Sequence, residues 1–160
     1  MDTSFERSNE GKDEWITPPY IIRALGRFDL DPCGAINQPF KTATKRYTSL
    51  DDGLSQPWNG RIWLNPPYGR ETKKWMGKLA SHGNGIALIF ARTETETFFK
   101  HIWPCADAIL FIEGRVRFYH SNGLIAKNSA GAPSCLIAYG KSNADVLSTC
   151  SLGGKFIKLK

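Results

Sequence analysis

The chain of 160 residues is long enough for one domain with a sizeable hydrophobic core and short for two. It carries 21 Lys and Arg against 15 Asp and Glu, a net charge of +6, and 12% of its residues are aromatic. No apolar stretch is as long as a membrane span, and the polar N-terminus has no signal-peptide core, so we expect a cytoplasmic protein with no membrane partner. The basic, aromatic balance fits nucleic-acid binding and, equally, ordinary solubilising charge.

Four cysteines lie far apart in the sequence and form no CxxC pair (Cys33, Cys105, Cys135 and Cys150). We therefore expect reduced thiols and no metal site. Residues 1–14 are polar and charged, which predicts a flexible N-terminal arm. Residues 15–160 are predicted to form a single domain, and the sequence carries no signal for its oligomeric state.

A short amphipathic helix is predicted to follow Thr17. This residue is a typical N-cap, and Pro18 suits the first helical position. Gly26 is the expected stop, and apolar residues recur at helical spacing (Ile21, Ile22, Leu25 and Phe28). The unpaired N–H groups at the start of such a helix could hold a carboxylate or phosphate, although a capped helix needs no ligand.

Two acidic turns come next. Residues 28–34 alternate apolar and acidic residues before a Pro-Cys-Gly break, which predicts a strand ending in a tight loop with Asp31 at its tip. Asp31 could accept a hydrogen bond from a cationic or hydroxyl-bearing cofactor, or it could simply start a turn. The turn at residues 51–54 carries Asp51 and Asp52. One of these aspartates could accept from the exocyclic amine of a nucleoside, or the pair could be solvated.

An apolar strand at residues 61–64 runs into a rigid turn made of Asn65, Pro66, Pro67 and Tyr68. The prolines fix the backbone and hold Asn65 extended at the end of the strand. The Asn65 amide oxygen and the Pro66 carbonyl can both accept from one exocyclic amino group, and the Tyr68 ring offers a face for stacking. Because open α/β sheets bind ligands at the carboxyl ends of their strands, the turn predicts a pocket for a planar amine; the alternative is a proline-rich turn without chemistry.

Helices and strands alternate over the next part of the chain. A helix is predicted to about residue 81, and a fully apolar strand at residues 85–91 suits the interior of a parallel sheet. A helix at residues 95–101 is then expected to bury three apolar side chains, Phe98, Phe99 and Ile102. A further apolar strand is predicted at residues 108–112.

From residue 115 the pattern changes to that of an antiparallel hairpin. Its predicted strands are residues 115–119 and 134–139, joined by a polar loop at residues 120–132. Residues 114–132 are a candidate DNA-contacting hairpin loop, or else the loop is only a long surface loop. The tail around Phe156 and Ile157 is a candidate edge strand. The predicted fold class is therefore α/β, with a mixed sheet flanked by helices and a C-terminal antiparallel hairpin.

Several short motifs occur in one order along the chain: Asp13-Glu14-Trp15 with Thr17-Pro18, Asp29-Leu30-Asp31-Pro32-Cys33, Asp51-Asp52-Gly53-Leu54 and Asn65-Pro66-Pro67-Tyr68-Gly69. In this combination the chain resembles the phage-type N6-adenine DNA methyltransferases of the Dam family over most of residues 13–140. The resemblance implies a single Rossmann-like methyltransferase domain, S-adenosylmethionine as cofactor and double-stranded DNA as partner. It also implies a phage-encoded enzyme that acts in a bacterial cytoplasm.

The resemblance assigns catalysis to the rigid turn (Asn65, Pro66, Pro67 and Tyr68). It assigns cofactor binding to three short segments (Thr17, Pro18, Asp31, Pro32, Cys33, Gly34, Asp51, Asp52, Gly53 and Leu54). By their placement, polar and basic residues near the turn and on the predicted hairpin are candidates for DNA contact (Arg70, Lys73, Lys74, Arg115, Arg117, His120, Asn122 and Lys127).

In this interpretation the target adenine flips out of the duplex and stacks on Tyr68, while Asn65 and the Pro66 carbonyl accept its amino protons. The same pocket would suit an RNA base or a protein glutamine side chain. A non-catalytic nucleic-acid-binding module is the remaining alternative.

Overall fold

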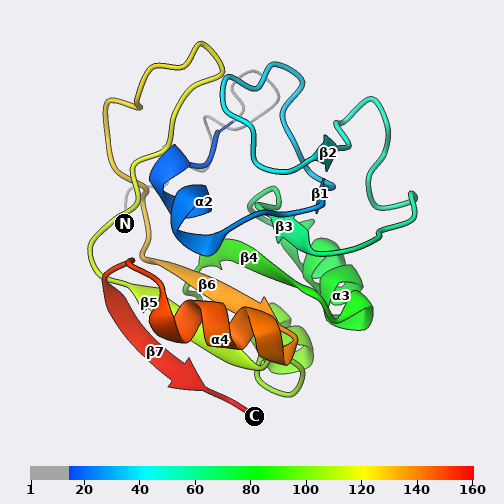
Figure 1. The fold of residues 1–160 in the computed structure, drawn as a ribbon, viewed down its shortest axis with the longest axis vertical. Coiled ribbons are helices and arrows are strands. Elements are labelled where there is room, and N and C mark those ends of the chain that lie inside the picture. Colours follow the sequence, from blue (N-terminus) through cyan, green and yellow to red (C-terminus); the bar gives the residue numbers. More distant parts are fainter. Residues whose placement is uncertain (1–14) are drawn as a thin grey trace.

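The computed structural model describes residues 15–160, and the predicted N-terminal arm lies outside the described residues. Within them the strands form one seven-stranded sheet in the order β2-β1-β3-β4-β6-β5-β7 (Figure 1). The strands are β1 (Leu30–Asp31), β2 (Lys45–Arg46), β3 (Ile62–Leu64), β4 (Gly85–Phe90), β5 (Ala108–Ile112), β6 (Ser134–Tyr139) and β7 (Gly154–Lys158).

The sheet is mixed, as predicted. Strands β2, β1, β3 and β4 run parallel, whereas β6 is antiparallel to both of its neighbours, β4 and β5, and β7 is antiparallel to β5. The chain leaves β1 toward β2 on one side and returns to β3 on the other side. The strand order therefore reverses between β1 and β3, and open α/β sheets bind ligands beside such a switch point.

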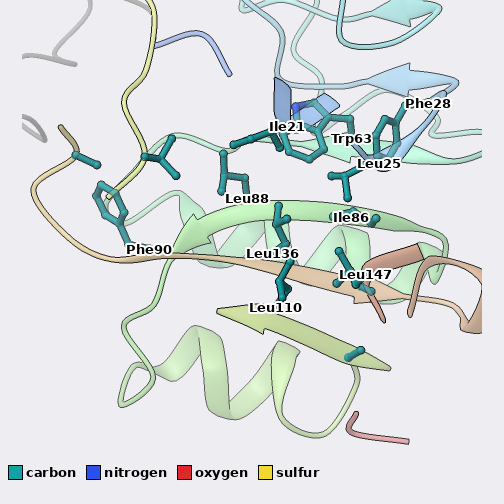
Figure 2. Close-up of a cluster of buried hydrophobic side chains, with 14 of the residues drawn as sticks. Ile21, Leu25, Phe28, Trp63, Ile86, Leu88, Phe90, Leu110, Leu136 and Leu147 are labelled. Carbon is teal, nitrogen blue, oxygen red and sulfur yellow. The ribbon is translucent and has the colours of Figure 1, made fainter. Parts of the chain in front are cut away.

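Helices cover both faces of the sheet. On one face, Ile21 and Leu25 of α2 (Pro19–Leu25) and Leu147 of α4 (Lys141–Thr149) join the cluster of buried side chains shown in Figure 2. On the other face, α3 (Thr72–His82) and the π-helix η1 (Phe98–Ile102) pack against alternate residues of the same strands. Both faces of β4 and β6 are buried, which explains why these strands are apolar throughout.

Two helix predictions need correction. Thr17 is not an N-cap, because Pro18 occupies that position without a side-chain cap and the Thr17 hydroxyl accepts a hydrogen bond from Asn65 instead. Gly26 ends the helix as expected, with a φ of 89°. Phe99 was predicted to be buried but is 65% exposed, because the residues around it form a π-helix that turns its side chain away from the core.

The predicted C-terminal hairpin is wrong. Residues 115–118 form no strand. Val116 and Phe118 are buried, and their carbonyls accept hydrogen bonds from the backbone N–H groups of Ala130 and Ala126, within the same connection between β5 and β6. The partners of β6 are β4 and β5. Since β6 is antiparallel to β4, the strand expected inside a parallel sheet, β4, is parallel only to β3. Strand β6 is buried on both faces and needs a partner on each side, which a hairpin at the edge of the sheet would not supply. The predicted strand in the tail is confirmed as β7, which pairs with β5 alone.

Candidate active site

A cavity of about 720 Å³ lies at the carboxyl ends of β1 and β3, beside the switch point. This volume suits a small organic cofactor together with part of a second ligand. Most of the predicted catalytic and cofactor-binding residues line the cavity, from four separate parts of the chain (Thr17, Asp31, Pro32, Cys33, Gly34, Asp52, Gly53, Asn65, Pro66, Pro67 and Tyr68). Pro18, Asp51 and Leu54 do not line it.

The Asn65 amide is held in a fixed orientation at the end of β3. Its Nδ2 donates to the Thr17 hydroxyl at 3.3 Å and to the Trp15 carbonyl at 3.4 Å. These bonds use the amino group of the amide, so its carbonyl oxygen is left to accept from a ligand. Thr17 is only 3% exposed, which makes it a rigid partner for this amide.

The two prolines after Asn65 differ in what their carbonyls do. The Pro67 carbonyl accepts from the Thr72 hydroxyl at 2.6 Å, which ties the turn to the start of α3. The Pro66 carbonyl receives no donor from the described residues. Two acceptors, the Asn65 amide oxygen and the Pro66 carbonyl, are therefore available at neighbouring positions of the turn, as the sequence predicts.

The Tyr68 ring is stacked on Phe90 at the end of β4. The two rings are nearly parallel, with an interplanar angle of 2° and centroids 4.1 Å apart, and Phe118 approaches the Tyr68 ring edge-on at 6.4 Å. Phe90 is 5% exposed and Phe118 is fully buried. One face of the Tyr68 ring is thus covered by the core, and that face is closed to a ligand.

Asp31 is a buried carboxylate at the end of β1, with 3% of its surface exposed. Burial raises the pKa of Asp31 to about 6, although hydrogen bonds from Thr42 and from the Cys33 N–H favour the charged form. The Thr42 hydroxyl donates to Oδ2 at 2.5 Å, and the Cys33 N–H donates to Oδ1 at 3.1 Å. Asp31 therefore shapes the loop after β1 as well as facing the cavity.

The loop at residues 51–56 forms another wall of the cavity, and α3 holds it in place. Lys78 of α3 donates to the carbonyls of Leu54 and Gln56 at 2.7 and 2.5 Å, and its ammonium lies 5.0 Å from the centre of the Trp58 ring. The Trp58 indole in turn donates to the Gly53 carbonyl at 2.8 Å. A Cβ on Gly53 would overlap the Pro32 carbonyl, so only glycine lets this loop pack on the loop after β1.

The two aspartates of this loop have different environments. Asp52 lines the cavity and has a positive φ of 54°. The Asp51 carboxylate instead accepts from the backbone N–H and the hydroxyl of Thr48, at 2.8 and 3.3 Å, which fixes the turn. Asp52 is therefore the better placed of the two for a cofactor contact.

The predicted DNA-contacting residues are scattered, and several have internal partners. Lys73 and Lys74 form ion pairs with Glu96 and Glu71. The guanidinium groups of Arg115 and Arg117 donate to backbone carbonyls of residues 126–130 and so brace the long connection. The Asn122 side chain accepts from the Leu124 N–H, and the His120 ring lies 4.8 Å from Trp15. Arg70 and Lys127 are exposed.

Other cavity residues were not predicted from the sequence (Trp15, Ile16, Ala35, Ile36, Gln38, Thr42, Thr48, Ser49 and Trp75). Gln38 organises the loop after β1, since its side chain accepts from the Ala35 N–H and donates to the Phe40 carbonyl and to Thr42. Polar residues in an irregular loop carry no periodic signal, so their contribution becomes visible only in the folded chain. No group of three or more potential metal ligands gathers among residues 15–160.

The cavity beside the switch point, with an Asn-Pro-Pro-Tyr turn at the end of the adjacent strand, lies where α/β enzymes bind their ligands. Residues 5–153 match the family model Dam, described as DNA N-6-adenine-methyltransferase, and the chain belongs to this family. No curated protein and no solved structure matches the chain.

The family defines the reaction: the protein methylates the N6 position of adenine in DNA and uses S-adenosylmethionine. The predicted family, activity and cofactor are thereby confirmed, and DNA is favoured over an RNA base, a protein glutamine or a non-catalytic role. Among residues 15–160, no helix has the length and apolar character needed to span a membrane.

Proposed function

We propose that the target adenine leaves the duplex and enters the cavity, where residues 65–68 bind its amino group and ring while residues 31–34 and 52–53 hold the cofactor. The observation that carries this proposal is the fixed amide of Asn65. Thr17 and the Trp15 carbonyl take up its amino group, and its carbonyl oxygen remains available within the cavity. Such a pre-oriented acceptor needs little rearrangement when a ligand amine arrives.

The two acceptors of the turn act on the adenine amine. Its nitrogen is a poor nucleophile because its lone pair is delocalised into the ring. Hydrogen bonds from its two N–H groups to the Asn65 amide oxygen and the Pro66 carbonyl place more negative charge on the nitrogen and favour a tetrahedral geometry. The prolines make these acceptors rigid, so much of the rate enhancement comes from positioning.

The residues around the remaining part of the cavity fit S-adenosylmethionine. When bound, this cofactor supplies a methyl group on a cationic sulfur, which is already a good electrophile. Asp31 and Asp52 place carboxylates in the cavity wall, as a cationic ligand with hydroxyl groups requires. The Thr17 hydroxyl accepts from Asn65 and keeps its own proton to donate to a carboxylate. Thr17 thus stands between the cofactor and the catalytic amide.

The flipped adenine stacks on the cavity side of Tyr68. Since Phe90 covers the opposite face at 4.1 Å, base, tyrosine and phenylalanine form one continuous stack. Stacking of a base on an aromatic side chain contributes about 1–3 kcal/mol, which helps to offset the cost of unstacking the base in the duplex.

We further propose that residues 15–160 form one Rossmann-like methyltransferase domain that acts on double-stranded DNA. The switch point between β1 and β3 supports this fold. Arg70, Lys74 and Lys127 are exposed candidates for phosphate contacts. Arg115 and Arg117 are exposed too, and they add positive charge to the connection that they brace.

The test is a comparison of Asn65→Ala with Asn59→Ala, in which the replaced side chain is exposed and outside the cavity. Transfer of labelled methyl groups to unmethylated DNA is followed by mass spectrometry of the nucleosides, and cofactor binding by calorimetry. We expect Asn65→Ala to lose about 10²–10³ in methyl transfer, as after removal of a polar group that stabilises a transition state. Its cofactor affinity should stay within twofold of the wild type, since the amide acts on the acceptor base. Wild-type activity in Asn65→Ala would overturn the assignment.

A further inference from the structure

A tight turn in the connection between β5 and β6 presents two large apolar side chains to solvent. Leu124 is 66% exposed and Ile125 is 46% exposed. Several hydrogen bonds hold the backbone of this turn: the His120 N–H donates to the Leu124 carbonyl, the Gly123 N–H donates to the His120 carbonyl, and Tyr119 forms a bridge with Ile125. The Asn122 side chain closes the turn by accepting from the Leu124 N–H at 2.9 Å. The apolar tip is therefore held out on a rigid support.

The support of this turn is also the rim of the cavity. Tyr119 forms an antiparallel bridge with Ile16, and the His120 ring lies 4.8 Å from Trp15; both Ile16 and Trp15 line the cavity. On its other side the turn meets the loop after β1, where the Phe40 ring contacts Tyr119 edge-on at 5.0 Å. In Figure 1 the yellow connection between β5 and β6 lies at the same end of the molecule as the light-blue and cyan loop after β1.

The segments around the turn carry only positive formal charge. Residues 36–50 and 115–133 contain no Asp or Glu, although the chain has 15 of them in total. The same two segments carry Lys41, Lys45, Arg46, Arg115, Arg117 and Lys127. An apolar tip on a segment whose formal charges are all positive suits a partner with a polyanionic outside and an apolar, stacked inside, which describes a nucleic-acid duplex.

We propose that Leu124, supported by Ile125, enters the DNA duplex as an apolar wedge at the base step that the target adenine leaves. This inference rests on the proposed entry of the adenine into the cavity. Extrusion of one base leaves a gap in the stack, and an apolar side chain that fills the gap makes the extruded state less unfavourable. In this proposal the turn fills the gap in the base stack and does not bind phosphate. Asn122 and His120 hold the turn in shape through their hydrogen bonds with Leu124.

The experiment compares Leu124→Ala and Leu124→Phe with Phe99→Ala, which removes a side chain of similar exposure (65%) on η1, away from the cavity. The methylated sequence is first mapped on unmethylated genomic DNA with the wild type. Single-turnover methylation is then measured on two duplexes of that sequence. In one the target adenine is paired, and in the other it faces an abasic site and is already weakly held.

We expect Leu124→Ala to slow methylation of the paired duplex by about tenfold or more, because unpairing and unstacking a base costs a few kcal/mol. On the duplex with the abasic site its rate should be within about twofold of the wild type, since little extrusion work remains. Leu124→Phe, which keeps an apolar side chain, and Phe99→Ala should resemble the wild type on both duplexes. 2-Aminopurine at the target position should become fluorescent with the wild type and less so with Leu124→Ala.

Other results would overturn the wedge. If Leu124→Ala matched the wild type on the paired duplex, or lost the same factor on both duplexes, Leu124 would have no part in extrusion. If Leu124→Ala instead changed the oligomeric state of the free protein in sedimentation velocity, the apolar tip would be a contact between copies of the chain. Absence of methyl transfer by the wild type to any DNA would overturn the proposed function, and the wedge with it, whereas the first two results leave the proposed function intact.

Discussion

Asp31 provides a direct test of the cavity because its environment couples stability to pH. The carboxylate is 3% exposed, and burial raises its pKa from 3.8 to about 6. The folded state therefore binds the proton of Asp31 more tightly than the unfolded state does. Below pH 3.8 this preference stabilises the fold in full, and the stabilisation is lost as pH rises through about 6.

The shift from 3.8 to about 6 corresponds to about 3 kcal/mol, since one pKa unit is worth about 1.4 kcal/mol. An Asn at this position has no charge to bury, so Asp31→Asn removes this contribution. The free energy of unfolding of the wild type, relative to that of Asp31→Asn, should therefore fall by about 3 kcal/mol in total as pH rises from below 4 to above 6. Other titrating groups are common to both proteins and largely cancel in the difference.

Urea unfolding at closely spaced pH values between 3.5 and 7.5 measures this difference, with tryptophan fluorescence as the signal. A difference that stays constant across this pH range would refute the argument. It would mean that Asp31 keeps an ordinary pKa, either because water reaches it or because its hydrogen bonds from Thr42 and Cys33 fully compensate for burial.

The same carboxylate links cofactor binding to pH. A cationic ligand in the cavity favours the charged form of Asp31, so binding should release a proton near pH 6 and the affinity should weaken below that pH. Calorimetry in two buffers with different ionisation enthalpies measures the proton release directly. An equal binding enthalpy in both buffers at pH 6 would exclude this coupling.

Three substitutions test the supports of the site. Thr17→Val removes the partner of the Asn65 amide and should lower kcat about tenfold, as the loss of one hydrogen bond of 1–1.5 kcal/mol implies, while Thr17→Ser, which keeps the hydroxyl, restores it. Lys78→Met frees the loop at residues 51–56 and should raise the KM for the cofactor several-fold, with kcat nearly unchanged. Lys74→Met, on the exposed side of the same helix, is the control. Equal KM values for the two variants would show that Lys78 does not hold the loop in place. Gly53→Ala forces this loop off the Pro32 carbonyl and should lower the free energy of unfolding by about 1–3 kcal/mol, as overpacking does, which thermal unfolding measures; an unchanged melting temperature would contradict the tight approach.

The site could be predicted from the sequence where the determinants are local. The apolar residues of β3 and the two prolines after Asn65 lie next to one another in the chain, so the strand and its rigid turn follow from local rules. The tight loop after Asp31 follows from similar rules. Thr17 shows the limit of this reasoning, because its partner is Asn65, 48 positions away, and this tertiary contact replaces the helix cap that the sequence indicates.

The C-terminal half was harder to predict because its pairing is nonlocal. Residues 115–119 alternate like a strand, yet the alternation serves only to bury Val116 and Phe118 under the long connection. Strand β6 is apolar enough to pair with any neighbour, and only the complete sheet determines that it enters between β4 and β5. Helix α4 was missed because its sequence is mostly polar, with Asn143 buried in place of an apolar residue.

The position of β6 also constrains the order in which the protein can fold during synthesis. Every residue that lines the cavity lies within residues 15–75, and these leave the ribosome before strands β4 to β7 do. The Tyr68 ring, however, stacks on Phe90 at the end of β4, and β4 gains its second neighbour only when residues 134–139 arrive. Pairing over such a separation is slow, because a long loop must close before any contact compensates for the lost entropy. A nascent chain that stops before β6 therefore carries all the chemical groups of the site without the framework that aligns them, and it should be inactive on DNA.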